Sequence, residues 1–231
     1  MEPADIARVV VAEQLGPVRT AIFTGSAAEG RATDHSDIDV VALIDGEPAP
    51  YRETLRSHGW VVELFVHDDA SIEHFFDLER RQRRCTLANM IASGQQISGD
   101  EGSALQEAAR AFIEVGPAPL DDSERERWRY RLTDAMDDLN GARDAEEREI
   151  VAAQVLMMAA ELCLVSRRQW GGEGKWLLRN LRGCDPKVSR ALMQGYREAV
   201  TLGDTDLLTA ACDDVLISLG GQLREGYVVR G

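Results

Sequence analysis

Ser36-Asp37-Ile38-Asp39 opens an apolar segment that runs to Ile44, and it follows an earlier apolar segment, Thr20–Thr24, that ends at Gly25-Ser26. Both segments have the length and composition of buried β-strands, and the glycine permits a tight turn at the end of the first. Side chains alternate between the two faces of a strand, so Asp37 and Asp39 project the same way while Ile38 points opposite. The sequence therefore predicts a pair of carboxylates at the start of the second strand.

The repulsion between these two carboxylates indicates their chemistry. At a separation of about 4 Å and an effective dielectric constant near 20, the pair costs roughly 4 kcal/mol. A hard divalent cation removes this penalty, and Mg²⁺ prefers carboxylate oxygens together with substrate phosphates. The pair therefore predicts a metal-dependent site for phosphoryl or nucleotidyl transfer.

A third acid, Glu63, lies inside the apolar segment Trp60–Val66, which reads as a third strand. A charged residue there is costly unless it is paired, binds a metal or faces water at a sheet edge. If the third strand lies beside the second, Glu63 completes a triad that can hold two Mg²⁺ ions about 3.5–4 Å apart. The Gly25-Ser26 turn is expected to supply backbone amides and a hydroxyl for the β- and γ-phosphates of a nucleotide.

Composition and charge limit the class of protein. The chain has 231 residues, of which 44% are hydrophobic and 29% charged, as in ordinary globular proteins. No apolar run is expected to reach the ~20 residues that span a bilayer, and the acidic N-terminus lacks the features of a signal peptide. We therefore expect a cytoplasmic protein without a membrane segment. The formal net charge of -14 argues against a long nucleic acid and favours a small or cationic acceptor.

The chain is expected to have two domains of an α+β protein. Gly116-Pro117-Ala118-Pro119 is the clearest break in the sequence, because the strand signals end there and amphipathic helical patterns follow. Residues 1–115 are predicted to form a head with a mixed β-sheet flanked by helices, and residues 120–231 a helical-bundle domain that contributes to substrate binding. The helices expected in the head cover residues 3–15, 51–57, 72–84, 86–92 and 104–115. In the tail, the apolar stripe of Trp128, Leu132, Met136 and Leu139 is followed by helical patterns over 150–165, 186–200 and 206–219.

The cysteines and histidines offer no strong signal of a zinc site or of disulfides. None of the four cysteines stands in a CxxC pair, and Cys163 and Cys212 lie within apolar helical patterns. We interpret them as buried thiols of a reducing compartment. The four histidines lack the spacing of zinc ligands.

Gly25-Ser26, then Gly30, then Ser36-Asp37-Ile38-Asp39 resembles the motif of the DNA polymerase β-type nucleotidyltransferase superfamily. Val61–Phe65 is similar to the strand that carries the third carboxylate of this family. A glutamate in that strand resembles the aminoglycoside nucleotidyltransferases that modify kanamycin and streptomycin. In the tail, Gly174-Lys175-Trp176 is similar to the Gly-Lys-Trp of the kanamycin enzyme, whose lysine contacts the nucleotide phosphates.

The resemblance implies two metal ions bound by Asp37, Asp39 and Glu63, an NTP substrate, most simply ATP, and a helical domain that closes over the site. It also implies a phosphate contact from Lys175, for which a helix cap and an ion pair with an acid are the alternatives, and a homodimer in which subunits share a site. The general base stays open, because the glutamate of the kanamycin enzyme four residues before the lysine is Gly171 here. The candidates are Glu63, which would then serve as metal ligand and base, Glu161 and Glu173.

The function expected from these observations is metal-dependent transfer of a nucleoside monophosphate from NTP to a hydroxyl of a small molecule, with release of pyrophosphate. AMP is the nucleoside monophosphate that we expect. An aminoglycoside-like antibiotic is one such acceptor and would make the protein a resistance factor. The alternatives are a nucleotidyltransferase of the toxin–antitoxin type that acts on a protein or on tRNA, and a degenerate regulator that only binds nucleotide.

Overall fold

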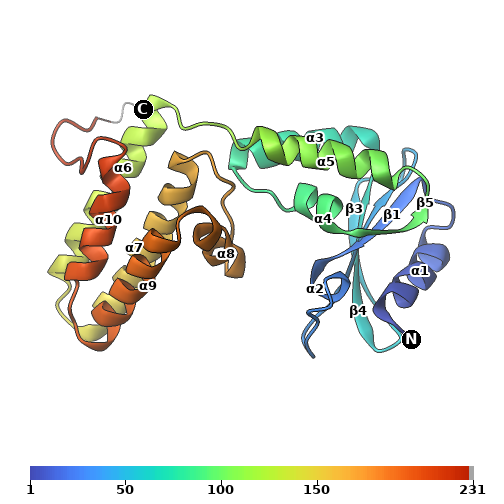
Figure 1. Cartoon of the computed structure of the whole chain (residues 1–231), viewed down its shortest axis with the longest axis horizontal. Coiled ribbons are helices and arrows are strands. Elements are labelled where there is room, and N and C mark those ends of the chain that lie inside the picture. The colour runs from blue at the N-terminus through green and yellow to red at the C-terminus, as the bar shows by residue number, and fades with distance from the viewer. Residues whose placement is uncertain (229–231) are drawn as a thin grey trace. The chain divides into compact units, whose positions relative to one another are not determined.

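The computed structural model describes residues 1–228 and divides the chain into two compact units (Figure 1). The first unit is Met1–Gly116, which we call the catalytic unit because it contains the carboxylates predicted to form the site, and the second begins at Pro117 and is called the helical unit. The break between them falls within the Gly-Pro-Ala-Pro sequence, where prolines without an amide donor cannot continue a helix. Each unit is described by itself.

The catalytic unit is built on a five-stranded mixed sheet with the strand order β3-β4-β2-β1-β5. Its strands are β1 (Thr20–Thr24), β2 (Ile38–Leu43), β3 (Tyr51–Ser57), β4 (Trp60–His67) and β5 (Gln95–Gly99). β2 and β4 pair in parallel, and the other neighbours pair antiparallel. This arrangement confirms the α+β class and the mixed sheet expected from the sequence.

Helices cover both faces of this sheet, which is why the central strand β2 is apolar almost throughout. The helices of the unit are α1 (Pro3–Gln14), α2 (Gly25–Ala28), α3 (Asp69–Gln82), α4 (Leu87–Ser93) and α5 (Gly102–Val115). On one face, Ile38, Val40 and Ala42 pack in a cluster with α1. On the other face, Val41 and Leu43 pack in a cluster with α3, α4 and α5. Asp39 lies on the same face of β2 as Val41 and Leu43, because side chains alternate along a strand. It lies just beyond the apolar cluster on that face.

A capping contact defines the start of α3. Asp68 and Ser71 form a reciprocal capping box at the start of α3, with the Ser71 amide donating to Asp68 Oδ1 at 2.8 Å. Gly94 follows the end of α4. These local signals fix the segment that leads from β4 into the covering helices.

Tyr51–Ser57 is a strand, so the helix predicted there is wrong. The strand pairs with β4 through a two-residue hairpin loop, in which Ser57 faces Trp60 and the loop residues are His58 and Gly59. Both loop residues have positive φ, 51° and 86°, as a type I′ turn requires. The mostly exposed charged residues of this edge strand removed the apolar alternation that normally identifies a strand.

Two further elements were not expected. β5 is a short edge strand that pairs with β1 across a register shift, and its residues are polar or half-buried. α8 occupies Lys175–Cys184, where the sequence analysis placed only a motif. β5 has too few apolar residues to stand out as a strand. α8 does have a helical apolar pattern, with Leu177 and Leu181 four residues apart and buried, and the sequence analysis did not use it.

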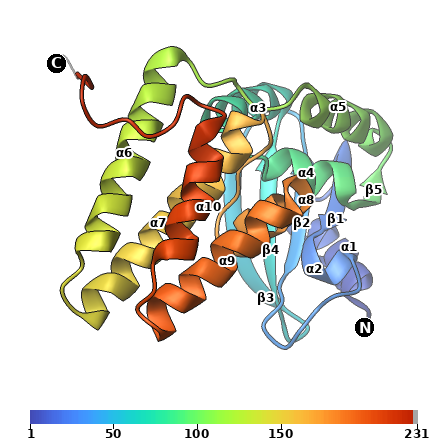
Figure 2. The same ribbon diagram turned by 60° about the vertical axis from the view of Figure 1, so that its left-hand side comes forward.

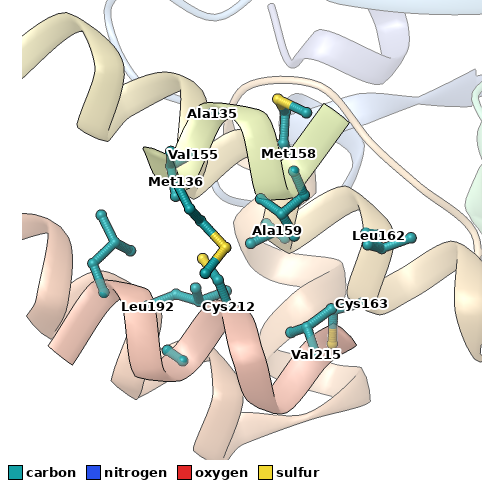
Figure 3. Packing of buried hydrophobic residues seen from close by; sticks show 14 of the residues in the cluster. Ala135, Met136, Val155, Met158, Ala159, Leu162, Cys163, Leu192, Cys212 and Val215 are labelled. Atoms are coloured by element: carbon teal, nitrogen blue, oxygen red, sulfur yellow. The ribbon is translucent and has the colours of Figure 1, made fainter. Parts of the chain in front are cut away.

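The helical unit contains five described helices that pack around one core (Figures 2 and 3). They are α6 (Asp122–Gly141), α7 (Ala145–Ser166), α8 (Lys175–Cys184), α9 (Pro186–Thr201) and α10 (Asp206–Ile217). Leu132, Met136 and Leu139 of the predicted stripe are buried, and Trp128 packs against the cluster. Figure 3 shows Met136 of α6 and Cys212 of α10 turned toward α7, the central buried helix.

α7 corrects one expectation, because its 22 residues are long and apolar enough to cross a membrane by length and composition alone. Half of its apolar window is buried inside the unit, with Val155, Ala159 and Leu162 in the core. The composition therefore follows from its central position in a helical core. This one helix is weak evidence for a membrane segment.

The four cysteines are free thiols in the structure. Cys163 and Cys212 are buried in the helical core, as predicted. Burial raises the pKa of Cys212 to about 12 and that of Cys163 to about 11, so neither carries thiolate character at neutral pH.

Candidate active site

The three predicted carboxylates lie together at one end of the sheet. Asp39 on β2 stands opposite Glu63 on β4 in the parallel register, so both side chains leave the same face. Asp37 joins them from the residue pair just before β2. One oxygen from each of Asp37, Asp39 and Glu63 lies within 4.8 Å of the other two. The condition set by the sequence, that the third strand lies beside the second, is met.

The chemistry of this group fits a divalent magnesium ion. All three side chains are partly buried, and at 4.8 Å and an effective dielectric constant near 20 each charged pair costs about 3 kcal/mol. The donors are all carboxylate oxygens, which suit Mg²⁺ better than softer metals. Asp37, Asp39 and Glu63 are therefore the residues that would hold the metal.

Arg52 on β3 completes the group and was missed by the sequence analysis. Its guanidinium donates to Glu63 Oε2 at 2.6 Å and lies 4.8 Å from the centre of the Phe65 ring. The Arg52 side chain is 58% exposed and that of Glu63 17%, so the pair sits at the surface. The sequence analysis did not pair Arg52 with Glu63, because the two residues share a face of the sheet only when residues 51–57 form a strand.

The residue directly after β1, Gly25, occupies a position that requires glycine. Gly25 and Ser26, predicted to form a turn, are the first two residues of the short helix α2. Gly25 has a φ of 79°, in the region that disfavours other residues. A Cβ atom added at Gly25 would overlap Oδ2 of Asp39. The backbone of Gly25 thus lies directly against the central carboxylate of the triad.

Ser26 and Ser36 tie this helix to the loop that carries Asp37. The Ser26 hydroxyl donates to Ser36 Oγ at 3.0 Å, and Ser36 Oγ also accepts the Thr33 amide at 2.9 Å. The Arg31 amide donates to the Ser26 carbonyl at 2.9 Å. Ser36 is therefore a positioning residue for the aspartates, a role that its place in the motif did not reveal. The Ser26 hydroxyl already has a protein partner, so its own contribution to a phosphate site would require an exchange of that bond.

A surface hollow of about 470 Å³ borders Asp37. Its lining comes from the loop before β2 and from the β3–β4 hairpin: Thr33, Asp34, His35, Ser36, Asp37, Arg56, Gly59, Trp60 and Val61. Its volume lies within the range of small-molecule sites, about 300–1,000 Å³. Arg56 brings a cation to this hollow, and within residues 1–228 no ion pair engages it. This edge of the sheet therefore offers both the acids and a charge of the sign that a phosphate needs.

An apolar hollow of about 370 Å³ continues along the same face of β4, past Phe65. Buried His67 hydrogen-bonds through Nδ1 to Ser71 Oγ at 3.2 Å, and burial lowers the pKa of this imidazole. Burial also raises the pKa of Glu79, although the amides at the start of α4, including that of Leu87 at 2.5 Å, donate to this carboxylate and oppose the shift.

The remaining predicted residues belong to the helical unit. Lys175 is the first residue of α8 and is exposed. Glu161 lies on α7, and Glu173 lies in the loop before α8. The carboxylate group of the catalytic unit is therefore complete without them, and their roles stay predictions.

Residues 8–90 match the model of the nucleotidyltransferase domain family. This part of the catalytic unit is therefore similar to a nucleotidyltransferase domain. The match runs from α1 to α4 and includes the triad, Gly25 and Ser26. The chain is thus an enzyme of the nucleotidyl-transfer class.

Other comparisons add little to this domain assignment. None of the curated proteins matches the chain. Among solved structures, the chain is similar to a nucleotidyltransferase-like protein from Exiguobacterium sibiricum, with 12% sequence identity and a TM-score of 0.47. That similarity covers 94% of this chain and 74% of the other.

Proposed function

We propose that this nucleotidyltransferase moves a nucleoside monophosphate, AMP in the first instance, from Mg²⁺-NTP to a hydroxyl of a small acceptor and releases pyrophosphate. The observation that carries the proposal is the group of three carboxylate oxygens within 4.8 Å of one another at one end of the sheet. Two Mg²⁺ ions, held by Asp37, Asp39 and Glu63, would supply charge neutralisation at the phosphates and a lowered pKa for the attacking hydroxyl.

Each residue of the site has a distinct part in this proposal. Gly25 and Ser26 place the backbone at the start of α2 next to Asp39, where the triphosphate would lie. Glu63 is the candidate base that accepts the proton of the acceptor hydroxyl, and Arg52 orients it through the 2.6 Å ion pair. Lys175 is proposed to contact the triphosphate from the helical unit. The oxygen of the acceptor attacks the α-phosphorus, the bond to the β-phosphate oxygen breaks, and pyrophosphate leaves.

The acceptor is proposed to be a small molecule, and an aminoglycoside-like antibiotic is the first class to test. The support is the net charge of -14, which favours a cationic partner over a polyanion. A homodimer that shares the site belongs to the same proposal and would be tested by sedimentation with and without NTP.

A second class of acceptor, a hydroxyl of RNA, is favoured by one observation. Residues 175–197 of the helical unit carry six Lys or Arg and one acid, against the charge of the whole chain. A positively charged segment of this kind would repel a cationic acceptor.

The test is pyrophosphate release with each of the four Mg²⁺-NTPs against a panel of aminoglycosides, lincosamides, tRNA and cell extract. Asp39→Asn should abolish release, while Asp45→Asn, a matched change at an exposed carboxylate beyond β2, should not. Equal release by wild type and the Asp39→Asn variant would contradict the proposal. Tight, metal-independent ATP binding without turnover would instead indicate a regulator.

A further inference from the structure

The helical unit carries a basic surface on α8 and the following helix α9. Between residues 175 and 197 the chain has six cationic side chains and one acid, a formal charge of +5 in a chain whose total is -14. The cations are Lys175, Arg179, Arg182, Lys187, Arg190 and Arg197, and all six are exposed. We call this set the basic surface.

The cations of the basic surface are not neutralised within the protein. Across residues 1–228, none of the six lies in an ion pair with a carboxylate. The one acid of the segment, Asp185, is instead bound to Arg167 at 3.2 Å. Some arginines elsewhere, such as Arg19 and Arg52, have carboxylate partners, whereas Arg56 has none among the described residues. An ordinary solvated helix face mixes both signs of charge, so this segregation indicates an anionic ligand.

Three of these arginines surround a hollow of about 690 Å³ on the helical unit. Arg182, Arg190 and Arg197 line it together with Ala191, Met193 and Leu207, and no acid is among its lining residues. The lining of the hollow therefore combines apolar side chains with three cations. A nucleobase requires the first and a phosphate the second.

An aromatic platform accompanies the charge. Trp176 is 46% exposed, and the guanidinium of Arg179 lies 4.8 Å from the centre of its ring. Exposed aromatic rings next to arginines are the stacking surfaces on which single-stranded nucleic acids place their bases. An acidic peptide would bind the cations, but its carboxylates would not contact the Trp176 ring or the apolar side chains of the hollow.

We infer that the basic surface binds single-stranded RNA, with phosphates on Arg182, Arg190 and Arg197 and a base stacked on Trp176. Both features lie within the helical unit, so the inference does not depend on the carboxylates or on the transfer reaction. RNA is then either the acceptor or a partner that localises the enzyme.

The test measures binding of a fluorescein-labelled, 20-nucleotide mixed-sequence RNA to the full chain by anisotropy, in EDTA and without NTP. The wild type should bind at 50 mM salt, and its affinity should fall steeply as salt rises. The triple variant Arg182→Gln, Arg190→Gln, Arg197→Gln should bind at least tenfold more weakly. The slope of log K against log salt should fall by about 2, because each phosphate contact on a single strand contributes about 0.7.

A matched control removes the same charge elsewhere on the unit. Arg127→Gln, Arg131→Gln, Arg143→Gln changes three exposed arginines outside the basic surface and should leave the slope unchanged. Trp176→Ala should weaken binding by about five- to a hundredfold through lost stacking, with the salt slope retained. Circular dichroism checks that each variant is folded.

Three results would overturn the inference. The first is no RNA binding by wild type at 50 mM salt, and the second is an equal loss in both triple variants. The third is competition by polyglutamate as effective as competition by poly-U, which would indicate an acidic protein. Because no NTP or metal is present, failure of the transfer reaction leaves each of these results interpretable.

Discussion

Gly25→Ala tests the site through one methyl group. Gly25 has a φ of 79°, and an alanine in this left-handed region costs about 1–2 kcal/mol of stability. The added Cβ would also overlap Asp39 Oδ2, so the aspartate must move away from its position beside Glu63. A displacement of about 1 Å at reacting groups can cost on the order of 100-fold in rate. We therefore expect a loss of about 100-fold or more in nucleotidyl transfer with a modest loss of stability.

Gly30→Ala is the matched control for this prediction. Gly30 has a φ of 67°, but a Cβ added there meets nothing within 4 Å. It carries the same backbone cost of about 1–2 kcal/mol without contact to the triad. The assays are pyrophosphate release at saturating Mg²⁺-NTP and urea unfolding followed by circular dichroism. Equal activity losses in the two variants, or full activity in Gly25→Ala, would refute the reasoning.

Three further predictions concern the charges of the catalytic unit. Mg²⁺ at a hundred times its dissociation constant should raise the unfolding free energy of the wild type by about 2.7 kcal/mol, and Asp39→Asn should lose this gain in a thermal-shift titration. Arg52→Gln should tighten Mg²⁺ binding by about two- to fivefold in calorimetry, because it removes the exposed cation that competes with the metal for Glu63; unchanged or weaker binding would contradict this competition. The lowered pKa of buried His67 means that its stabilising effect is present above the unfolded value near 6.5 and is lost as pH falls through the folded pKa. His67→Gln should therefore flatten the decrease in unfolding free energy between pH 7.5 and 5.5, and an unchanged pH profile would contradict this cause.

The sequence predicted the part of the fold that is buried and periodic. β1, β2 and β4 are nearly continuous apolar segments, because helices cover both faces of the sheet, and their positions agree with the expectation. The pairing of Asp39 with Glu63 followed once β4 lay beside β2. The helix predicted from residue 72 is present as α3, which starts at Asp69 after the capping box of Asp68 and Ser71.

The features that the sequence did not predict are edge strands of the sheet and contacts between residues that are distant in the chain. β3 is exposed and charged, so its identity rested on the His58-Gly59 turn rather than on hydrophobic alternation. Because residues 51–57 were predicted to be a helix, the contact of Arg52 with Glu63 was not predicted. This contact depends on the register of β3 with β4. Similarly, the overlap of an alanine at Gly25 with Asp39 is a tertiary contact that no spacing rule encodes. The basic surface was hidden because the net charge of -14 averages over two units.

The central claim is that the carboxylate triad carries metal-dependent transfer of a nucleoside monophosphate. The most direct measurement compares ATP labelled at the α-phosphate with ATP labelled at the γ-phosphate, incubated with the enzyme and the acceptor panel in Mg²⁺ or in EDTA. The account predicts that the α-label appears on an acceptor and the γ-label in pyrophosphate, only with Mg²⁺ and not with Asp39→Asn. Transfer of the γ-label to the acceptor, or transfer of the α-label that persists in EDTA, would contradict it.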